Sequence, residues 1–176
     1  FPGKLTNINS SNPSELKKYL NLHDISFQKG IEDQILILNE NEFRLVNIHG
    51  IEEFNKFGQN LFTPDINKSE NPIDNESLYI GRTLATRLDL SIGDAVIISQ
   101  TERINIFTGL PNRKQMLVGG IFDVDILDYN QKHIFCNYDL ISSFIPEKQN
   151  TLYLDKPLEV QLISEIKVLF PEIRYK

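Results

Sequence analysis

Short apolar blocks separated by polar stretches run along the first fifty residues of the chain. The segment "GKLTNIN" alternates weakly, which predicts a strand, and "SSNPSELKKYLNL" predicts a short helix capped by Asn12 or Ser14, with Pro13 in its first turn. The blocks "QILILNE" and "EFRLVNIHGI" are rich in Ile, Leu and Val, and the polar "NENE" between them predicts a hairpin. The predicted order is therefore β, α, β, β by about residue 50.

The middle of the chain starts with a polar stretch and continues with strand and helix patterns. Residues 63–77 hold two prolines and hardly any apolar side chains, which predicts a surface loop. The segment "LYIGRTLATRLDLSIGDAVIIS" then predicts a strand that ends at Ile80, a helix with Leu84 and Leu88 on one face, and a strand over 95–99. The blocks "MLVGGIF" and "HIFCN" predict two further strands.

The last part of the chain repeats the pattern of its beginning. "YDLISSFI" predicts a short helix that ends at Pro146, and "NTLYLDKPLEVQLISEIKVLFPEIRYK" predicts strand, helix and strand, with the helix stopped by Pro171. The apolar stripe of that helix consists of Leu158, Leu162, Ile166 and Leu169. Two β-α-β units whose helices cover one face of a common sheet form a split, ferredoxin-like α+β layer. Residues 1–50 and 149–176 are thus expected to form this layer, and residues 51–148 a mostly β insertion.

Several glycines in this insertion have backbone roles. Gly119 and Gly120 inside a predicted strand indicate a bulge or a close backbone approach. Gly81 and Gly93 lack the spacing of a phosphate loop or a dinucleotide fingerprint, so we interpret them as punctuation between elements.

The amino-acid composition and the net charge exclude some classes of protein. The 176 residues are 40% hydrophobic and 24% charged, as in ordinary globular domains. A net charge of −6 argues against a nucleic-acid partner. The sequence contains no apolar stretch of membrane-spanning length and no signal-peptide pattern. Because it begins with Phe1 rather than Met, we expect an excised piece of a longer protein whose flanks could be transmembrane.

The nucleophilic side chains form no catalytic constellation. Cys136 lies in the apolar run "HIFCNY", and His133, three positions away on a predicted strand, would point to the opposite face. We therefore expect an inert buried thiol. Ser142 and Ser143 lie on a predicted helix without a G-x-S-x-G elbow, so serine catalysis is not expected.

The candidate metal ligands are equally sparse. Asp123 and Asp125 share a face of a predicted strand and Asp128 follows, an arrangement that suits a hard cation or an acid/base pair. A calcium loop would need a glycine that the segment lacks, which favours a solvated strand end. The histidines lie far apart without ligand spacing: His23, His49 and His133. We expect neither a metal site nor a cofactor.

The segment "ISQTERINIFTGLPNRKQMLVG" joins two predicted strands through a connection of about fifteen residues. Connections of that length in compact domains are usually functional. An apolar tip with glycine and proline, flanked by cations, suits a recognition element, because apolar anchors give affinity and charges steer association. The alternative is that Ile104, Ile106 and Phe107 fold down onto the sheet.

The same region carries a resemblance to a known family. "YIGRTLATRLDLSIGDAVIIS", the connection, and "VGGIFDVDILDYNQKHIFCNYDLISSFI" resemble the periplasmic domain of lipoprotein-releasing ABC transporter permeases of the LolC and LolE type. The matching positions are Ile80-Gly81-Arg82, Leu84-Ala85, Leu88, Gly93-Asp94, Val118 to Phe122, and Asp128-Tyr129-Asn130. The wider MacB-like and FtsX-like permeases share this scaffold, so a MacB-like exporter or an FtsX-like permease is the alternative.

The resemblance implies a fold, a location and a set of partners. The split layer would be porter-like and the insertion Sabre-like, with a hook hairpin at about 100–115. The domain would face the periplasm as part of an inner-membrane permease, joined to the membrane by flanking helices. Its partners would be a LolA-type lipoprotein carrier, the lipoprotein cargo, a second permease subunit and a cytoplasmic ATPase. Catalysis would belong to the ATPase, so this chain would not be an enzyme.

The resemblance also implies residue roles in the hook. The partner-binding residues would be Ile106, Phe107, Thr108, Gly109, Leu110 and Pro111. Arg113 and Lys114 would lie at its base against an acidic or carbonyl-rich surface of the carrier. The connection is somewhat shorter here than in well-known members of the family.

Overall fold

The computed structural model describes residues 3–8, 13–40, 42–54, 76–145 and 149–176. The chain divides into two compact units, one made of Phe1–Glu32 and Glu147–Lys176 and the other of Asp33–Pro146. The first division therefore falls inside a strand rather than at residue 50, where the sequence placed it. The reason is that the residues after Glu32 pair with strands of the second unit.

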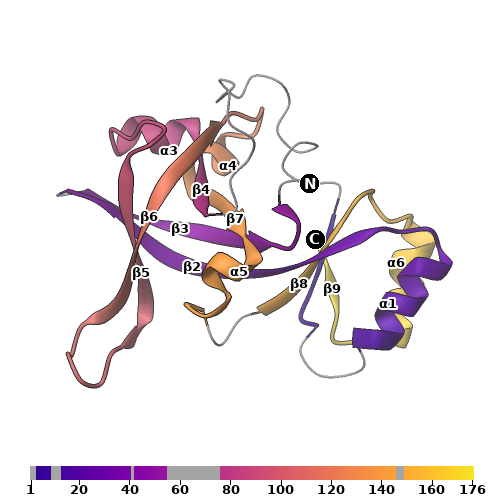
Figure 1. Ribbon diagram of the computed structural model, residues 1–176. Helices are drawn as coiled ribbons and strands as arrows, with labels where there is room; N and C mark the ends of the chain where they lie inside the picture. The colour runs from indigo at the N-terminus through magenta and orange to yellow at the C-terminus, as the bar shows by residue number, and fades with distance from the viewer. Residues whose placement is uncertain (1–2, 9–12, 41, 55–75, 146–148) are drawn as a thin grey trace. The chain divides into compact units, whose positions relative to one another are not determined.

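The first unit is an antiparallel sheet with two helices. Its elements are β1 (Lys4–Thr6), α1 (Pro13–Leu22), the first part of β2 (Phe27–Asn39), β8 (Gln149–Leu154), α6 (Val160–Leu169) and β9 (Arg174–Tyr175). The strand order is β2-β8-β1-β9, and every neighbouring pair is antiparallel. Each terminal segment of the chain thus contributes a β-α-β unit (Figure 1). In the first of them the strand that pairs with β8 is Phe27 to Glu32, which precedes the predicted strand "QILILNE".

The core of this unit forms between the helices and one sheet face. Leu16 and Leu20 lie one turn apart on α1 and are fully buried with Leu5 and Leu154. On α6 the buried residue is Ile166, and Leu162, Ile163 and Phe170 pack partly against the same core. The predicted stripe is wrong at Leu169, the last residue of α6, which is 56% exposed.

A tyrosine–carboxylate bond joins the two helices. The hydroxyl of Tyr19 donates to Glu165 Oε2 at 2.5 Å, and this bond raises the pKa of Tyr19 from 10.0 to about 12. We expect spectrophotometric titration to place Tyr19 near pH 12, and Glu165→Gln to return it towards 10.0. Because the folded-state pKa is the higher one, the stabilisation is complete below pH 10 and is lost as the pH rises to about 12. An unchanged titration in the Glu165→Gln variant would contradict the assignment.

The second unit is a barrel of six strands. Its strands are the second part of β2, β3 (Glu42–Ile51), β4 (Ser77–Gly81), β5 (Ala95–Ile104), β6 (Pro111–Phe122) and β7 (His133–Asn137). They are ordered β3-β7-β4-β6-β5-β2, and pairing between β2 and β3 closes the ring. The pairs β3/β7 and β4/β6 are parallel, and β2/β5, β4/β7 and β5/β6 are antiparallel.

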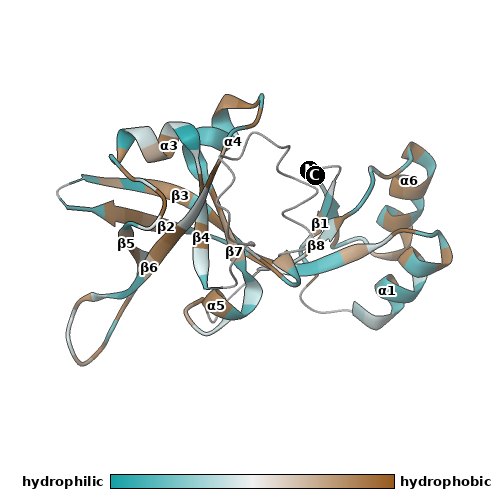
Figure 2. Cartoon of the chain, turned by 45° about the horizontal axis from the view of Figure 1, so that its top comes forward, coloured by the Kyte–Doolittle hydropathy of each residue, from teal (hydrophilic) through white to brown (hydrophobic). Residues whose placement is uncertain are grey.

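Among the residues that the structure describes, the short helices α3 (Arg82–Arg87), α4 (Leu127–Lys132) and α5 (Tyr138–Ser142) accompany the barrel. Figure 1 shows α3 and α4 at the same end of the barrel. The barrel interior is filled by alternate residues of the strands, among them Ile35, Ile37, Val46, Ile48, Val96 and Ile98. Figure 2 shows hydrophobic (brown) stretches on the strands of the barrel beside hydrophilic (teal) ones. Helix α4 is not predicted by the sequence pattern.

The glycine pair of β6 forms the predicted bulge. Leu78 pairs with Val118 and Tyr79 with Gly120, so Gly119 is the extra residue on β6. A Cβ built on Gly119 would lie 2.4 Å from Ser77 Cβ, which shows the close approach of the two strands. The prediction of a bulge with close backbone contact is therefore confirmed.

Two further sequence expectations concern the chain as a whole. The predicted loop at 63–77 lies almost entirely outside the described residues, which resume at Glu76 before β4. Within the described ranges, none of the helices combines the length and apolar character needed to cross a membrane.

Candidate functional site

The hairpin formed by β5 and β6 is longer and more regular than the sequence predicts. Its ladder runs from Ala95 paired with Leu117 to Ser99 paired with Arg113, and resumes at Ile104 paired with Pro111. The connection is therefore six residues rather than about fifteen. The sequence pattern does not predict the outer part of these two strands. Polar residues occupy both faces there, and such a stretch resembles a loop.

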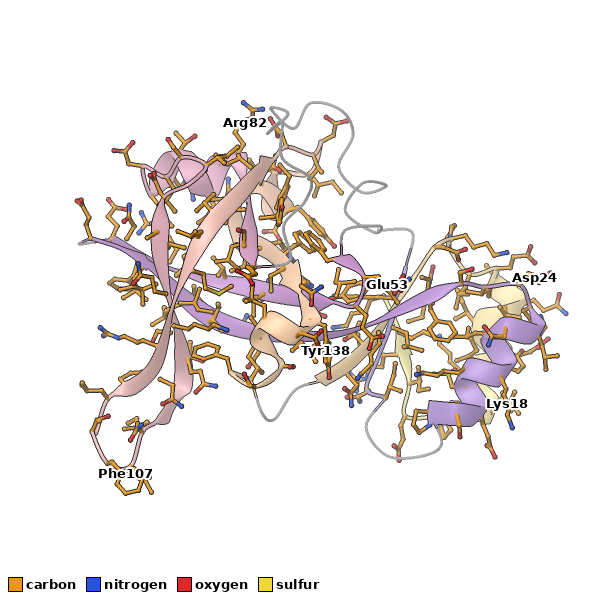
Figure 3. The ribbon with its side chains drawn as sticks, viewed as in Figure 1. Lys18, Asp24, Glu53, Arg82, Phe107 and Tyr138 are labelled. Atoms are coloured by element: carbon orange, nitrogen blue, oxygen red, sulfur yellow. The ribbon has the colours of Figure 1, made fainter. Side chains whose placement is uncertain are left out.

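The apolar side chains at the end of this hairpin lie at the surface. Ile106 is 88% exposed, Phe107 is 91% exposed, and Ile104 and Leu110 are 62% and 60% exposed. Figure 3 shows Phe107 at the far end of the hairpin, pointing away from the barrel. The alternative in which Ile104, Ile106 and Phe107 fold down onto the sheet is therefore wrong. We call residues 105–110 the hairpin tip.

The tip is held by hydrogen bonds within itself. Asn105 Oδ1 accepts from the backbone N–H groups of Phe107 at 2.9 Å and Thr108 at 3.3 Å. The Asn105 carbonyl accepts from the N–H of Gly109 at 2.8 Å, and the Asn105 N–H donates to the Leu110 carbonyl at 2.8 Å. Gly109 has φ of +67°, a conformation that favours glycine and turns the chain back into β6.

The base of the hairpin is braced against the end of α5. The Lys114 ammonium donates to the carbonyl of Leu140, and the Gln100 side chain donates to the carbonyl of Phe144. Asn112 donates in turn to Gln100 Oε1 at 3.0 Å. Arg113, by contrast, is exposed. The two cations expected at the hook base thus differ: one is bound to the barrel and the other faces solvent.

Two histidines that are far apart in the sequence meet on neighbouring strands of the barrel, on the face opposite to Ile48. His49 on β3 and His133 on β7 are buried, and His49 Nε2 lies 2.7 Å from His133 Nδ1. Their rings stack, and Phe135 and Tyr129 stack on either side of the pair. Their spacing in the sequence does not predict this pair, which the parallel register of β3 and β7 brings together.

The other candidates for chemistry have structural partners. Cys136 is fully buried, as predicted, and burial raises the pKa of its thiol. Asp128 pairs with Lys132 at 2.7 Å, which lowers the pKa of Asp128, and Asp128 also lies 3.7 Å from His133 Nε2. Among the described residues no group of three or more His, Cys, Asp or Glu side chains is arranged to hold a metal ion.

Asp123 joins the two helices at one end of the barrel. Its carboxylate accepts from Arg82 Nε at 2.7 Å and from Asn130 Nδ2 at 2.6 Å. Arg82 begins α3 and Asn130 lies on α4. Asp123 is exposed at the end of β6, as predicted, and it also ties α3 and α4 to that strand end.

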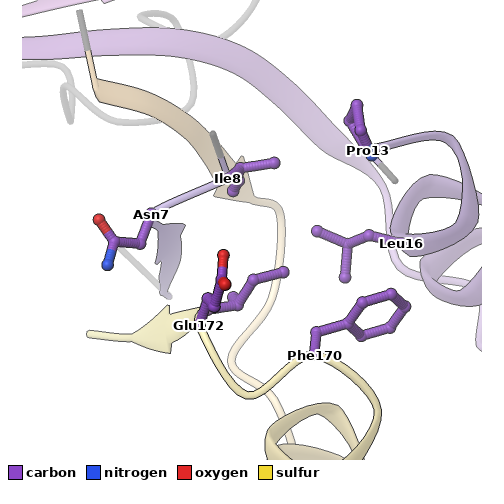
Figure 4. A pocket seen from close by; sticks show the side chains of 7 residues that line it. Asn7, Ile8, Pro13, Leu16, Phe170 and Glu172 are labelled. Atoms are coloured by element: carbon purple, nitrogen blue, oxygen red, sulfur yellow. The ribbon is translucent and has the colours of Figure 1, made fainter. Parts of the chain in front are cut away.

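A small hollow lies in the first unit beside α1 (Figure 4). Its lining residues are Asn7, Ile8, Pro13, Leu16, Phe170, Glu172 and Ile173. Most of these side chains belong to the core of the unit or its margin, and they offer neither a nucleophile nor a pair of acid/base groups. The hairpin tip is therefore the strongest candidate for a working surface.

The comparisons with known proteins concern the fold. No protein family and no curated protein matches the sequence. A domain of a protein assigned as a permease from Porphyromonas gingivalis aligns at a TM-score of 0.43 and 10% identity, over 85% of this chain and 70% of that one. That score is too low to support an argument. The extracellular domain of the noncanonic ABC-type transporter YknZ from Gram-positive bacteria aligns at a TM-score of 0.54 and 11% identity, over 92% of this chain and 86% of that one. This chain is thus similar in fold to an extracellular domain of an ABC-type transporter.

Proposed function

We propose that this chain is the extracytoplasmic domain of an ABC transporter permease. The observation that carries the proposal is the fold likeness to the YknZ extracellular domain, which extends over most of both chains. In this proposal the domain faces the periplasm, and membrane helices of the same permease flank it. A second permease subunit and a cytoplasmic ATPase complete the transporter. The ATPase performs the catalysis, and this domain transmits movement.

We further propose the two-part architecture typical of such permeases. The order β2-β8-β1-β9, with a helix in each β-α-β unit, supports a split ferredoxin-like, porter-like layer. The barrel between its halves would be the inserted, Sabre-like subdomain. The two residue ranges would then be Phe1–Glu32 with Glu147–Lys176 for the layer and Asp33–Pro146 for the insertion.

Within this class we propose a lipoprotein-releasing permease that hands its cargo to a LolA-type carrier. The exposed apolar tip supports this choice, because a large apolar side chain displayed at the end of a hairpin suits insertion into a partner. Ile106, Phe107 and Leu110 would be the anchors. A MacB-like exporter or an FtsX-like permease is the second candidate, favoured if the tip has no carrier to bind.

The remaining hook residues would shape and orient the tip. Thr108 Oγ1 accepts from the Leu110 N–H at 3.3 Å, and Gly109 and Pro111 lead the chain back into β6. Arg113 would face the carrier and steer its approach. Lys114 would act at the base by fixing the hairpin to α5 through Leu140.

Calorimetric titration of the 176-residue chain with the purified LolA-type carrier of the same organism tests the proposal. We expect saturable binding at a ratio of one carrier to one domain. Absence of binding would exclude the lipoprotein-releasing assignment and would leave the MacB-like exporter or the FtsX-like permease.

We predict that Arg113→Glu slows association with the carrier by about tenfold at low ionic strength and flattens its dependence on salt, since a cation facing a partner mainly accelerates encounter. Stopped-flow measurements at two salt concentrations give the rates. Arg44→Glu is the control, because Arg44 is a partly exposed arginine on a barrel strand but lies on β3 and pairs with Glu42. Equal rates for the Arg113 variant and the wild type would remove the steering role.

A further inference from the structure

We propose that Asn105 is a positioning residue of the hairpin tip, which fixes the turn that presents Ile106 and Phe107 and so strengthens recognition without touching the partner. The inference rests on the proposed function in one respect, namely that the tip binds a protein. The sequence pattern indicates partner-binding roles for residues 106–111 and no role for Asn105.

The geometry of Asn105 makes it the organising residue of the turn. Its side-chain oxygen accepts from the N–H groups of Phe107 and Thr108, and its backbone carbonyl accepts from Thr108 at 3.2 Å and Gly109 at 2.8 Å. Its own N–H closes the tip on the Leu110 carbonyl. One residue therefore takes part in five of the hydrogen bonds that define the tip. Asparagine is suited to this task because its short amide bonds to backbone two residues ahead.

These bonds have a consequence for the kind of partner that fits. The backbone N–H groups of residues 105, 107, 108, 109 and 110 all donate within the tip. Burying a donor without a partner is costly, whereas these donors are already satisfied. The tip is thus prepared to enter an apolar concave surface of the carrier, and it offers few free donors for pairing with a partner strand.

The tip has few contacts other than these hydrogen bonds to hold it in one conformation. Ile106, Phe107 and Leu110 are exposed, so no core packing orders them. A Cβ built on Gly109 would meet no atom within 4 Å, so no neighbouring group packs there against the chain as it turns back into β6. Without the Asn105 side chain the segment would therefore sample other conformations, and binding would have to order it again.

Three variants of the 176-residue chain test the inference: Asn105→Ala, Asn105→Asp and, as control, Asn112→Ala at the hairpin base. Amide hydrogen exchange of Phe107 and Thr108 is measured on the free chain, and carrier affinity by calorimetry. We expect Asn105→Ala to lose the protection of the Phe107 amide, whereas the Thr108 amide keeps its bond to the backbone carbonyl of residue 105. The variant should bind the carrier about fivefold to tenfold more weakly, with the thermal midpoint unchanged. Asp accepts the same two bonds, so Asn105→Asp should restore protection and most of the affinity. Asn112→Ala should keep both.

Each outcome decides the inference. Wild-type protection in Asn105→Ala, or loss of protection in Asn105→Asp equal to that in Asn105→Ala, overturns it. Loss of protection without loss of affinity overturns the role in recognition. If the wild-type chain does not bind the carrier, the proposed function fails, and the exchange measurement still decides whether Asn105 orders the tip.

Discussion

Phe107→Glu is expected to weaken carrier binding by about 2–4 kcal/mol, roughly thirtyfold to a thousandfold, which is the range for central anchor residues. Phe107 is 91% exposed and lies at the end of the hairpin, so a partner that binds the tip must cover it. A carboxylate in its place would be buried without a partner in an apolar surface. Isothermal calorimetry of the variant against the LolA-type carrier gives the loss directly.

The fold should be unaffected by this change, because substitution of an exposed side chain alters stability by only about 0.5 kcal/mol. Phe43→Glu is the matched control: Phe43 is a 62% exposed phenylalanine on β3 of the same unit. We expect the control to bind as the wild type does. Leu110→Glu should behave like Phe107→Glu, with a smaller loss because Leu110 is less exposed.

The result would be contradicted if Phe107→Glu and Phe43→Glu bound the carrier equally well. Equal weakening in both variants would indicate a broad apolar contact rather than a tip, and would remove the hook assignment. A thermal midpoint that falls in the Phe107 variant alone would show that the side chain packs in the folded chain, contrary to its exposure.

The elements that the sequence predicts are those with a clear apolar pattern, either a continuous buried run or an apolar face at helical spacing. Strand β7 is a buried apolar run, and α1 places Leu16 and Leu20 one turn apart, so both are visible as patterns. Helix α4 is missed because its buried residue, Asn130, is polar, so it shows no apolar face. The first part of β2 is missed because Gln28, Lys29 and Gly30 do not resemble a strand.

The candidate site was predictable only in its apolar residues. A run such as Ile106 and Phe107 beside glycine and proline is visible without a structure, whereas its exposure is not. The role of Asn105 depends on distances across the turn, and that of Lys114 on a carbonyl of α5. The pairing of His49 with His133 depends on the register of two strands separated by about eighty residues. Contacts between distant segments have no signature in one sequence.

Gly81→Ala is expected to destabilise the barrel by about 1–3 kcal/mol or more, the cost typical of overpacking. Gly81 has φ of −70° and ψ of 145°, a conformation that any residue adopts, so its backbone alone does not require glycine. The added methyl group would lie 2.4 Å from the backbone oxygen of Asn130 and 2.5 Å from its Cα. The expected loss is therefore purely steric and is measured as the free energy of unfolding in urea.

The neighbouring structure offers little room for relief of this clash. Asn130 Nδ2 donates to Asp123 and to the Val124 carbonyl at 2.8 Å, and its Oδ1 accepts from the Val124 N–H at 3.0 Å, so α4 is fixed where the methyl group would enter. Gly93→Ala is the informative control, because Gly93 has φ of +96° and a Cβ there meets nothing within 4 Å. Gly93→Ala should lower the free energy of unfolding by about 1 kcal/mol, through backbone strain alone. A smaller loss at Gly81 than at Gly93 would mean that α4 moves away from β4 easily, and that the Asp123–Asn130 tie does not hold it.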